Sequence, residues 1–416
     1  MTAHHQGDQD TDPADRPGNP ATGPETGHPG RARLPPVLWL LATGAFAIGT
    51  DAFVIAGVLT ELSAELAVSP GTAGQLITVF SLAYAVLAPV NASLTGRLSR
   101  RTVLAVALAV FVAGNLISAF AGSFAVVLAG RVVAAAGAAG YTPQASAAAA
   151  ALAGEERRGA ALSVVIGGLT VATALGVPLG TFVGEAFGWR ATLLGVAGLG
   201  ALALAGALAL LPRLEPAGRH TIAERLAGLR NPAVLITLSV TLLAVTAEHV
   251  VYTYIAPLLT DVTVGSGEAL AVLLLIFGVG AVAGNAVAGP LTDRFGPRAI
   301  AVAAVGGMVV DLALLPLWSR SFAAAAVALF VWGATGWMYL VPQQYRLLAL
   351  SESGGPFTVA LNSSALYLGI ALGGGLGGVL ITVAGAHALA VPAFVLGLAA
   401  VLIAARTYTP PEQPRS

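Results

Sequence analysis

Ionisable side chains interrupt long apolar stretches of this sequence at five positions, namely Asp51, Arg131, Glu248, His249 and Asp311. A charged group in a nonpolar environment is unfavourable unless it is paired, hydrogen-bonded or neutralised by proton transfer. Such groups bind protons, counter-ions or ligands, so all five are candidates for proton coupling. Which of them act together depends on the helices that carry them.

The composition indicates what surrounds these charges. Of 416 residues, 56% are hydrophobic and only 10% are charged, and the mean hydropathy is +0.84. A soluble domain needs more charged surface than this, whereas helices in lipid need almost none. The 51 glycines fit close packing of membrane helices. We therefore predict an all-α membrane protein.

Apolar runs of roughly 18 to 25 residues, the length that crosses a bilayer, are separated by short polar breaks. Twelve transmembrane helices are predicted from these runs. Their approximate bounds are 36–60, 73–95, 102–121, 124–151, 160–184, 191–211, 233–258, 268–290, 299–318, 322–345, 356–384 and 386–405.

The polar segments divide the chain into two similar parts. One offset aligns the segment from Gly96 with that from Gly289, and also aligns Leu175 with Leu368. We interpret this as a duplication that gives two pseudo-symmetric six-helix bundles. The predicted organisation is a disordered tail (1–34), a first bundle (35–212), a linker (213–231), a second bundle (232–406) and a short tail (407–416).

The arginines predict the orientation of the chain in the membrane. Nearly all of them fall in the tails and in loops on one side, and such loops stay in the cytoplasm. Both tails are then cytoplasmic, and the expected location is the cell inner membrane as a multi-pass protein.

Asp51 and Arg131 are predicted to lie at similar depths, so they can pair if their spans are neighbours. Such a pair is either a proton carrier that also contacts substrate or a purely structural ion pair. Glu248 occupies a position in the seventh span similar to that of Asp51 in the first. The neighbouring His249 points about 100° away on a helix, and a structural hydrogen bond is the preferred interpretation for it. Asp311 has no predicted partner.

Polar and aromatic groups in the spans are candidates for a mostly apolar substrate cavity, although packing alone also explains most of them. Trp39, Trp189 and Trp318 near span ends are expected to be interfacial anchors. The cavity candidates are Tyr84, Tyr141, Gln144, Tyr252, Tyr254, Trp332, Trp337 and Asn362.

Four segments of the sequence form distinctive motifs. The loop after the eighth span contains Gly289, Asp293, Arg294, Gly296 and Arg298, whereas the corresponding loop of the first half, at Gly96, lacks the Asp. Span five contains Gly176, Pro178 and Gly180, which close packing and a kink would also explain. Span one contains the segment from Gly49 to Gly57, and span eleven contains Asn362.

These motifs resemble the major facilitator superfamily, and within it the twelve-span drug/proton antiporters similar to arabinose-efflux and chloramphenicol-resistance permeases. The span-five motif is similar to the one associated with antiporters.

The resemblance implies the major facilitator fold, a gate at the loop motif and a secondary transporter. The expected function is export of small drug-like molecules in exchange for protons by alternating access. A sugar or metabolite exporter is the nearest alternative, and a non-transporting membrane scaffold is a remote one.

Other classes of function find little support. The chain has no cysteine, no cluster of metal ligands, no phosphate-binding loop and no basic patch. We therefore expect no enzyme activity, no cofactor beyond the proton gradient that drives transport and no nucleic acid. The expected partners are the lipid bilayer, protons and a small-molecule substrate, with the protein acting as a monomer.

Overall fold

The computed structural model describes residues 35–94, 98–153, 158–212, 230–350 and 355–407. Residues 35–416 form one compact unit. The tail 1–34, the tail after Thr407 and the predicted linker up to residue 229 lie outside the described residues.

Every regular element in these ranges is a helix. The spans of the first half are α1 (Val37–Gly57), α3 (Pro70–Leu94), α4 (Arg100–Ala119), α5 (Phe124–Ala153), the continuous α6 (Arg158–Val171), η2 (Ala172–Gly176) and α7 (Val177–Phe187), and α8 (Trp189–Leu210). Those of the second half are α10 (Pro232–Tyr252), α13 (Gly267–Phe295), α14 (Pro297–Ala313), α16 (Phe322–Met338) with α17 (Leu340–Ala349), α18 (Gly355–Ala384) and α19 (Ala390–Thr407). Short helices α2 (Leu59–Glu65), α11 (Ile255–Leu258), α12 (Thr260–Thr263), α15 (Leu315–Trp318) and η4 (Ala386–Leu389) lie between spans.

In the described ranges, 11 helices are long and apolar enough to cross a membrane. The twelfth span is α14, which has 17 residues and ends at a turn before α15 continues to Trp318. The predicted span 299–318 covers both helices. Exposed Leu, Val and Phe side chains occur along most of the spans, as expected of helices that face lipid. The all-α, twelve-helix membrane prediction is confirmed.

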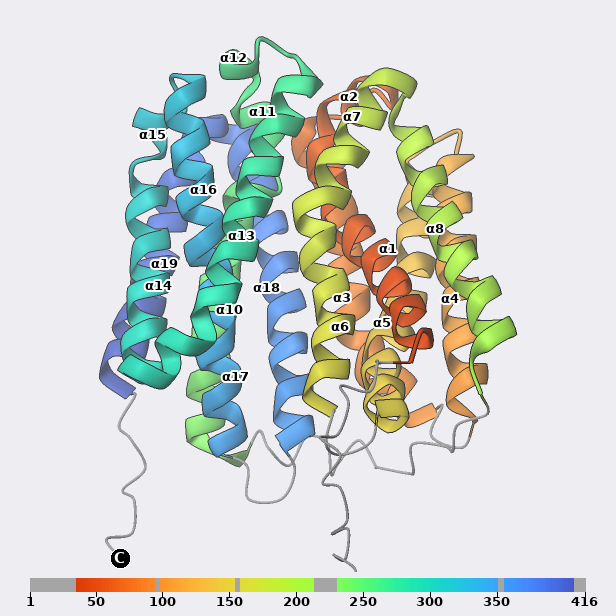
Figure 1. Ribbon diagram of the computed structural model, residues 1–416. Helices are drawn as coiled ribbons and strands as arrows, with labels where there is room; N and C mark the ends of the chain where they lie inside the picture. Colours follow the sequence, from red (N-terminus) through yellow and green to blue (C-terminus); the bar gives the residue numbers. More distant parts are fainter. Residues whose placement is uncertain (1–34, 95–97, 154–157, 213–229, 351–354, 408–416) are drawn as a thin grey trace, which may run out of the picture. The chain divides into compact units, whose positions relative to one another are not determined.

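The two sides of the helix bundle are distinguished by the short helices (Figure 1). We call the side where α1 begins and α19 ends the terminal side, and the opposite side the far side. In Figure 1 α2, α11, α12 and α15 lie at the top, on the far side. The predicted ends of spans one and seven, at residues 60 and 258, are too late because the chain turns into α2 and α11 instead of continuing straight.

The repeat predicted from the sequence has a counterpart in the backbone. Span five ends at Gly188 with φ 85°, and span eleven ends at Gly385 with φ 81°. Both glycines adopt a left-handed conformation that other residues rarely accept, and each begins the turn into the last span of its half. The two halves also pack together, with α3 along α18 and α7 along α13.

Candidate functional site

The centre of the first half contains an ion pair between α1 and α5. Arg131 Nη1 donates to Asp51 Oδ1 at 2.6 Å, and Nη2 donates to the Asp51 carbonyl oxygen at 3.1 Å. Both side chains have 0% exposure. The prediction that these residues face each other is confirmed, and the structure adds a second contact to the backbone of α1.

Small residues allow α1 to approach its neighbours closely enough for this pair to form. A Cβ atom on Gly44 would lie 2.3 Å from the Tyr141 hydroxyl of α5. A Cβ on Gly49 would lie 2.8 Å from Ala172 in η2. In lipid, where helices gain little from burying apolar surface, such close contact supplies much of the packing energy. The glycines of α1 therefore hold Asp51 within reach of α5.

The pair retains unused hydrogen-bonding capacity. Asp51 Oδ2 and Arg131 Nε are buried without a partner of hydrogen-bonding geometry, and the Asn115 side chain of α4 lies close enough to interact with the carboxyl group. The Arg131 guanidinium lies 4.2 Å from the centre of the Phe80 ring on α3, a cation–π contact. One carboxylate oxygen can therefore take a proton without first breaking the contact through Oδ1.

The second half contains a carboxylate of a different kind. Glu248 lies four residues before the end of α10, nearer the far side than predicted, and only 7% of it is exposed. Within the described ranges it makes no ion pair. A Cβ atom built on Gly336 of α16 would lie 3.2 Å from Glu248 Oε1. Gly336 thus allows α16 to approach this carboxylate closely.

Aromatic rings form a continuous group next to Glu248. The Tyr252 ring lies 5.1 Å from Phe277 and 6.2 Å from Trp332, with the last pair edge to face. Phe277 and Trp332 are 5.6 Å apart. Phe53 of α1 lies 6.3 Å from Tyr252, so a residue of the first half completes the group. We call Phe53, Tyr252, Phe277 and Trp332 the aromatic cluster.

His249 is held by its own helix. Its Nδ1 lies 3.0 Å from the Val245 carbonyl oxygen, which requires Nδ1 to carry the hydrogen. Nε2 is then a free acceptor in the neutral ring, and it is buried without a partner. The ring lies 6.2 Å from Phe53 and 5.8 Å from Tyr252. The preferred interpretation, a structural hydrogen bond, is compatible with this geometry.

Asp311 and Trp318 meet at the far end of α14. Trp318 Nε1 donates to the Asp311 carbonyl oxygen at 2.9 Å, and Asp311 Oδ2 is buried without a partner. Trp318 is 5% exposed and Trp189 is 0% exposed. Their expected role as interfacial anchors is therefore wrong, because both pack inside the protein. Trp39, which is 64% exposed, remains suited to that role.

Several cavity candidates take part in helix packing. Tyr141 donates to the Leu41 carbonyl oxygen at 2.9 Å, and Tyr254 donates to that of Gly374 at 2.7 Å. Tyr84 stacks on Tyr367 of α18, with 3.7 Å between ring centres. These contacts support the packing interpretation for all three tyrosines. Tyr84 and Tyr367 come from different halves, so their stack also joins the halves.

The remaining candidates are placed as follows. Asn362 Oδ1 accepts a hydrogen bond from Thr241 at 2.7 Å, and Gln343 donates to the same threonine hydroxyl at 3.3 Å. This network links α10, α17 and α18. Gln144 is 9% exposed and its Oε1 has no partner, whereas Trp337 is partly buried against the core.

The antiporter-like motif lies where span five changes its helical geometry. The π-helix η2 ends at Gly176, two residues before Pro178, and proline removes a backbone donor there. A Cβ on Gly176 would lie 2.0 Å from Thr50 Oγ1, and one on Gly180 would lie 2.4 Å from Val54. The close-packing alternative is therefore observed for both glycines.

The loop motif joins α13 to α14. Gly296 has φ 82°, which explains the glycine at the turn. Arg298 donates to the Ala405 carbonyl oxygen of α19, and Arg294 lies 5.1 Å from the Phe295 ring. A Cβ on Gly289 would meet no atom within 4 Å, and Asp293 makes no ion pair with any described residue.

The far side contains charged contacts that sequence reasoning missed. Glu65 of α2 pairs with Arg190 and accepts a hydrogen bond from Trp189 Nε1 at 2.7 Å. Arg190 also donates to the Ala121 carbonyl oxygen at 3.0 Å. Glu65 lies 124 residues from Trp189 in the sequence, and only the fold brings the start of α8 to the end of α2.

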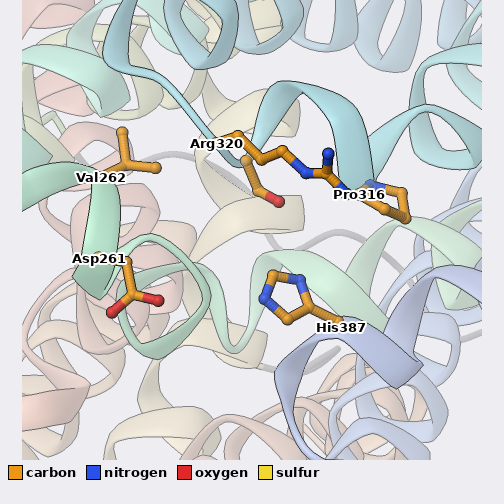
Figure 2. Close-up of a pocket in the computed structure, with 6 residues that line it drawn as sticks. Asp261, Val262, Pro316, Arg320 and His387 are labelled. Carbon is orange, nitrogen blue, oxygen red and sulfur yellow. The ribbon is translucent and has the colours of Figure 1, made fainter.

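A pocket of about 450 Å³ opens on the far side of the second half (Figure 2). Asp261 and Val262 lie on one side of it, and Pro316 and His387 lie on the other. None of the candidate residues named above lines this pocket. It is separate from the Asp51 pair and from Glu248.

Comparison with known proteins identifies the family. The model of the Major Facilitator Superfamily matches residues 41–345 and 237–416. The chain is 36% identical to the chloramphenicol resistance protein of Streptomyces lividans over 351 residues, which cover 82% of this chain and 88% of that protein. It is 32% identical to the inner membrane transport protein YdhP of Escherichia coli (strain K12), with 88% and 94% covered.

A third relative, the putative transporter AraJ of Escherichia coli (strain K12), is 28% identical, with 88% of this chain and 93% of AraJ covered. The proteins of this family move solutes and do not catalyse reactions, in agreement with the prediction of a transporter instead of an enzyme. The twelve membrane helices, the duplicated halves and these matches agree. The chain belongs to the major facilitator superfamily of multi-pass membrane transporters.

Proposed function

We propose that this protein exports small organic molecules in exchange for protons by alternating access. The observation that supports this most is the fully buried Asp51–Arg131 pair, because a carboxylate held in a bilayer by one cation is suited to reversible protonation. The relative named for chloramphenicol resistance favours drug-like cargo. A sugar or metabolite exporter of the same fold is the alternative that the choice of substrates tests.

The proposed transport cycle depends on whether Asp51 is ionised and paired with Arg131 or protonated and neutral. In the ionised state the pair is neutral overall, and Arg131 is held by both contacts. When a proton binds at Oδ2, Asp51 becomes neutral and the attraction through Oδ1 weakens, which leaves a net positive charge at the site. Arg131 is then free to bind an acceptor on the substrate or in water. Loss of the proton restores the pair and releases that acceptor.

Close contacts join the two halves from the far side to the middle of the helices. A Cβ on Gly74 of α3 would lie 2.2 Å from the Tyr254 hydroxyl, and one on Gly278 of α13 would lie 2.2 Å from Ala174. Both contacts join the two halves. We take the terminal side as cytoplasmic because the arginine-rich loops and both tails are expected there. Rocking of the two halves relative to each other then exposes the Asp51–Arg131 pair to each side of the membrane in turn.

The proton gradient supplies the energy, no bound cofactor takes part, and the monomer is the transporting unit. The test is accumulation of radiolabelled chloramphenicol in everted membrane vesicles energised by an imposed pH gradient. We expect accumulation with the wild type, its loss in Asp51→Asn and its retention in Asp261→Asn, an exposed far-side control. Accumulation in Asp51→Asn equal to that of the wild type would contradict the proposal, as would accumulation without a pH gradient.

A further inference from the structure

Glu248 is a buried carboxylate that makes no ion pair with any residue the structure describes. Arg131 and Arg190 are paired with other acids, Asp51 and Glu65. A buried carboxylate without a counter-ion is unfavourable unless a proton or a positively charged ligand joins it. Gly336 of α16 packs directly against this carboxylate, since a Cβ atom there would lie 3.2 Å from Glu248 Oε1 and 3.5 Å from the Trp332 ring. The position is therefore suited to a cation that comes from outside the chain.

The aromatic cluster supplies the second requirement for such a ligand. The faces of aromatic rings carry partial negative charge and attract cations, most strongly when water is excluded. Tyr252 and Trp332 are 3% and 0% exposed, and Phe277 packs against both. Tyr339 also lies close enough to Glu248 to interact electrostatically with it. A carboxylate and several rings thus share one water-poor region.

Unused polar atoms provide a third, independent observation. Tyr252 Oη, Trp332 Nε1 and His249 Nε2 are buried without hydrogen-bond partners. Buried polar atoms normally have hydrogen-bond partners. Three unpaired polar atoms close together indicate a place where a ligand or water supplies the missing hydrogen bonds. The Tyr252 ring lies 5.8 Å from His249 and 6.2 Å from Trp332, so the three unpaired atoms belong to side chains that contact one another.

The position between the halves suits a transported ligand. Phe53 of α1 contacts the cluster from the first half, whereas Glu248, Phe277 and Trp332 belong to the second. Movement of the halves relative to one another would separate Phe53 from Tyr252 and open the cluster. Asp51 lies two residues before Phe53 on the same helix, so the two carboxylate sites are linked through α1.

We propose that Glu248 and the aromatic cluster form the binding site for an organic cation, a molecule with a delocalised or substituted ammonium or phosphonium charge and apolar groups. This inference rests on the proposed function for its transport role, but the binding itself does not require proton exchange. Glu248 contacts the charge, the rings pack around its substituents, and the Tyr252 and Trp332 donors remain available to polar atoms of the ligand.

Equilibrium binding of radiolabelled tetraphenylphosphonium to the purified full-length protein tests this site. We expect saturable binding that weakens about tenfold or more in Glu248→Gln and is partly restored in Glu248→Asp, because the charge is the main attraction. Glu268→Gln, an exposed carboxyl in the first turn of α13, is the matched control and should change the affinity less than about twofold. Trp332→Leu should weaken binding, whereas Trp332→Phe should weaken it less.

A second measurement does not depend on a variant that folds. Dicyclohexylcarbodiimide reacts with buried carboxyl groups, and mass spectrometry of the wild type then reports the labelled residue. Tetraphenylphosphonium should protect Glu248 from labelling. Absence of saturable binding, equal affinity in folded Glu248→Gln, or labelling of Glu248 that the cation does not reduce would each overturn the inference.

The outcomes separate this inference from the proposed function. Binding that depends on Glu248, in a protein that moves no protons, would leave the cation site standing and remove proton antiport. Proton-coupled transport of chloramphenicol without Glu248-dependent cation binding would do the opposite. Substrate-linked transport and equilibrium binding therefore test the two claims independently.

Discussion

Two buried carboxylates, Asp51 and Glu248, occupy the first span of each half, but their surroundings differ. Asp51 is bound by Arg131 through its side chain and its backbone, and both residues are inaccessible to solvent. Glu248 has no ion-pair partner among the described residues and faces the aromatic cluster instead. The two similar halves thus contain one carboxylate that is paired with an arginine and one that makes no ion pair with a described residue. We assign proton exchange to Asp51 and binding of a positively charged ligand to Glu248.

The largest expected effect comes from removing the cation of the pair. Arg131→Met should lower the stability by about 3–5 kcal/mol, because the Asp51 carboxylate is then buried without compensation. The thermal unfolding midpoint of the detergent-purified protein measures this loss. The double variant Asp51→Asn with Arg131→Met should recover much of it. A single variant as stable as the wild type would remove the distinction between the two carboxylates.

Glu248→Gln should behave in the opposite way. Neutralising an acid that has no counter-ion removes an unfavourable burial, so the unfolding midpoint should stay the same or rise, a change of about 1 kcal/mol at most. The same thermal measurement applies. A loss of stability as large as that in Arg131→Met would mean that Glu248 has a partner in the folded protein, and the comparison would fail.

The close contact between the two halves at Gly278 gives an intermediate effect. Gly278→Ala places a Cβ 2.2 Å from the Ala174 Cα atom, so backbone must move for the halves to meet. We expect transport to slow about tenfold, with substrate binding within about threefold of the wild type. Gly289→Ala, whose new Cβ meets no atom within 4 Å, is the matched control and should transport at near the wild-type rate.

The smallest effect concerns Glu61 on the far side. Its Oε2 is buried without a partner, and burial raises the pKa of this carboxyl above its ordinary value of 4.5, with the Glu185 charge adding to the rise. The folded protein therefore holds the proton to a higher pH than the unfolded chain. The stabilising contribution is complete below pH 4.5 and is lost as the pH rises through the raised pKa.

Glu61→Gln stays neutral and should flatten this dependence. The unfolding midpoint of the wild type, measured from pH 4.5 upward, should fall slightly more steeply with pH than that of the variant. Glu65→Gln is unsuitable as a control because Glu65 pairs with Arg190, so Glu268→Gln serves instead. Identical slopes in wild type and Glu61→Gln would exclude a raised pKa.

Much of the fold follows from the sequence because apolar run length is a direct measure of bilayer crossing. The pairing of Asp51 with Arg131 also follows, since depth along a helix can be counted from its end. Trp189 illustrates the limit. It lies at a span end, but its environment is set by Glu65 of α2, a short helix in a segment where the apolar pattern predicts only a polar break between spans.

The sequence also does not predict which side chains surround Glu248. Periodicity shows which side of a helix faces the core only when another side is polar, and α10 is apolar nearly all round. Residue type alone predicts Tyr252 and Trp332 as cavity candidates but gives no reason to select their neighbour Phe277. Phe53 lies within the span-one motif, and nothing in the sequence shows that it contacts the second half.

The most direct test of the assigned division of roles is proton flux measured together with substrate flux in proteoliposomes. The substrates are chloramphenicol and tetraphenylphosphonium, and the proteins are the wild type, Asp51→Asn and Glu248→Gln. We predict that Asp51→Asn loses substrate-dependent proton movement with both substrates, whereas Glu248→Gln loses it only with the cation. Proton movement that survives in Asp51→Asn, or that Glu248→Gln abolishes with both substrates, would contradict this division of roles between the two carboxylates.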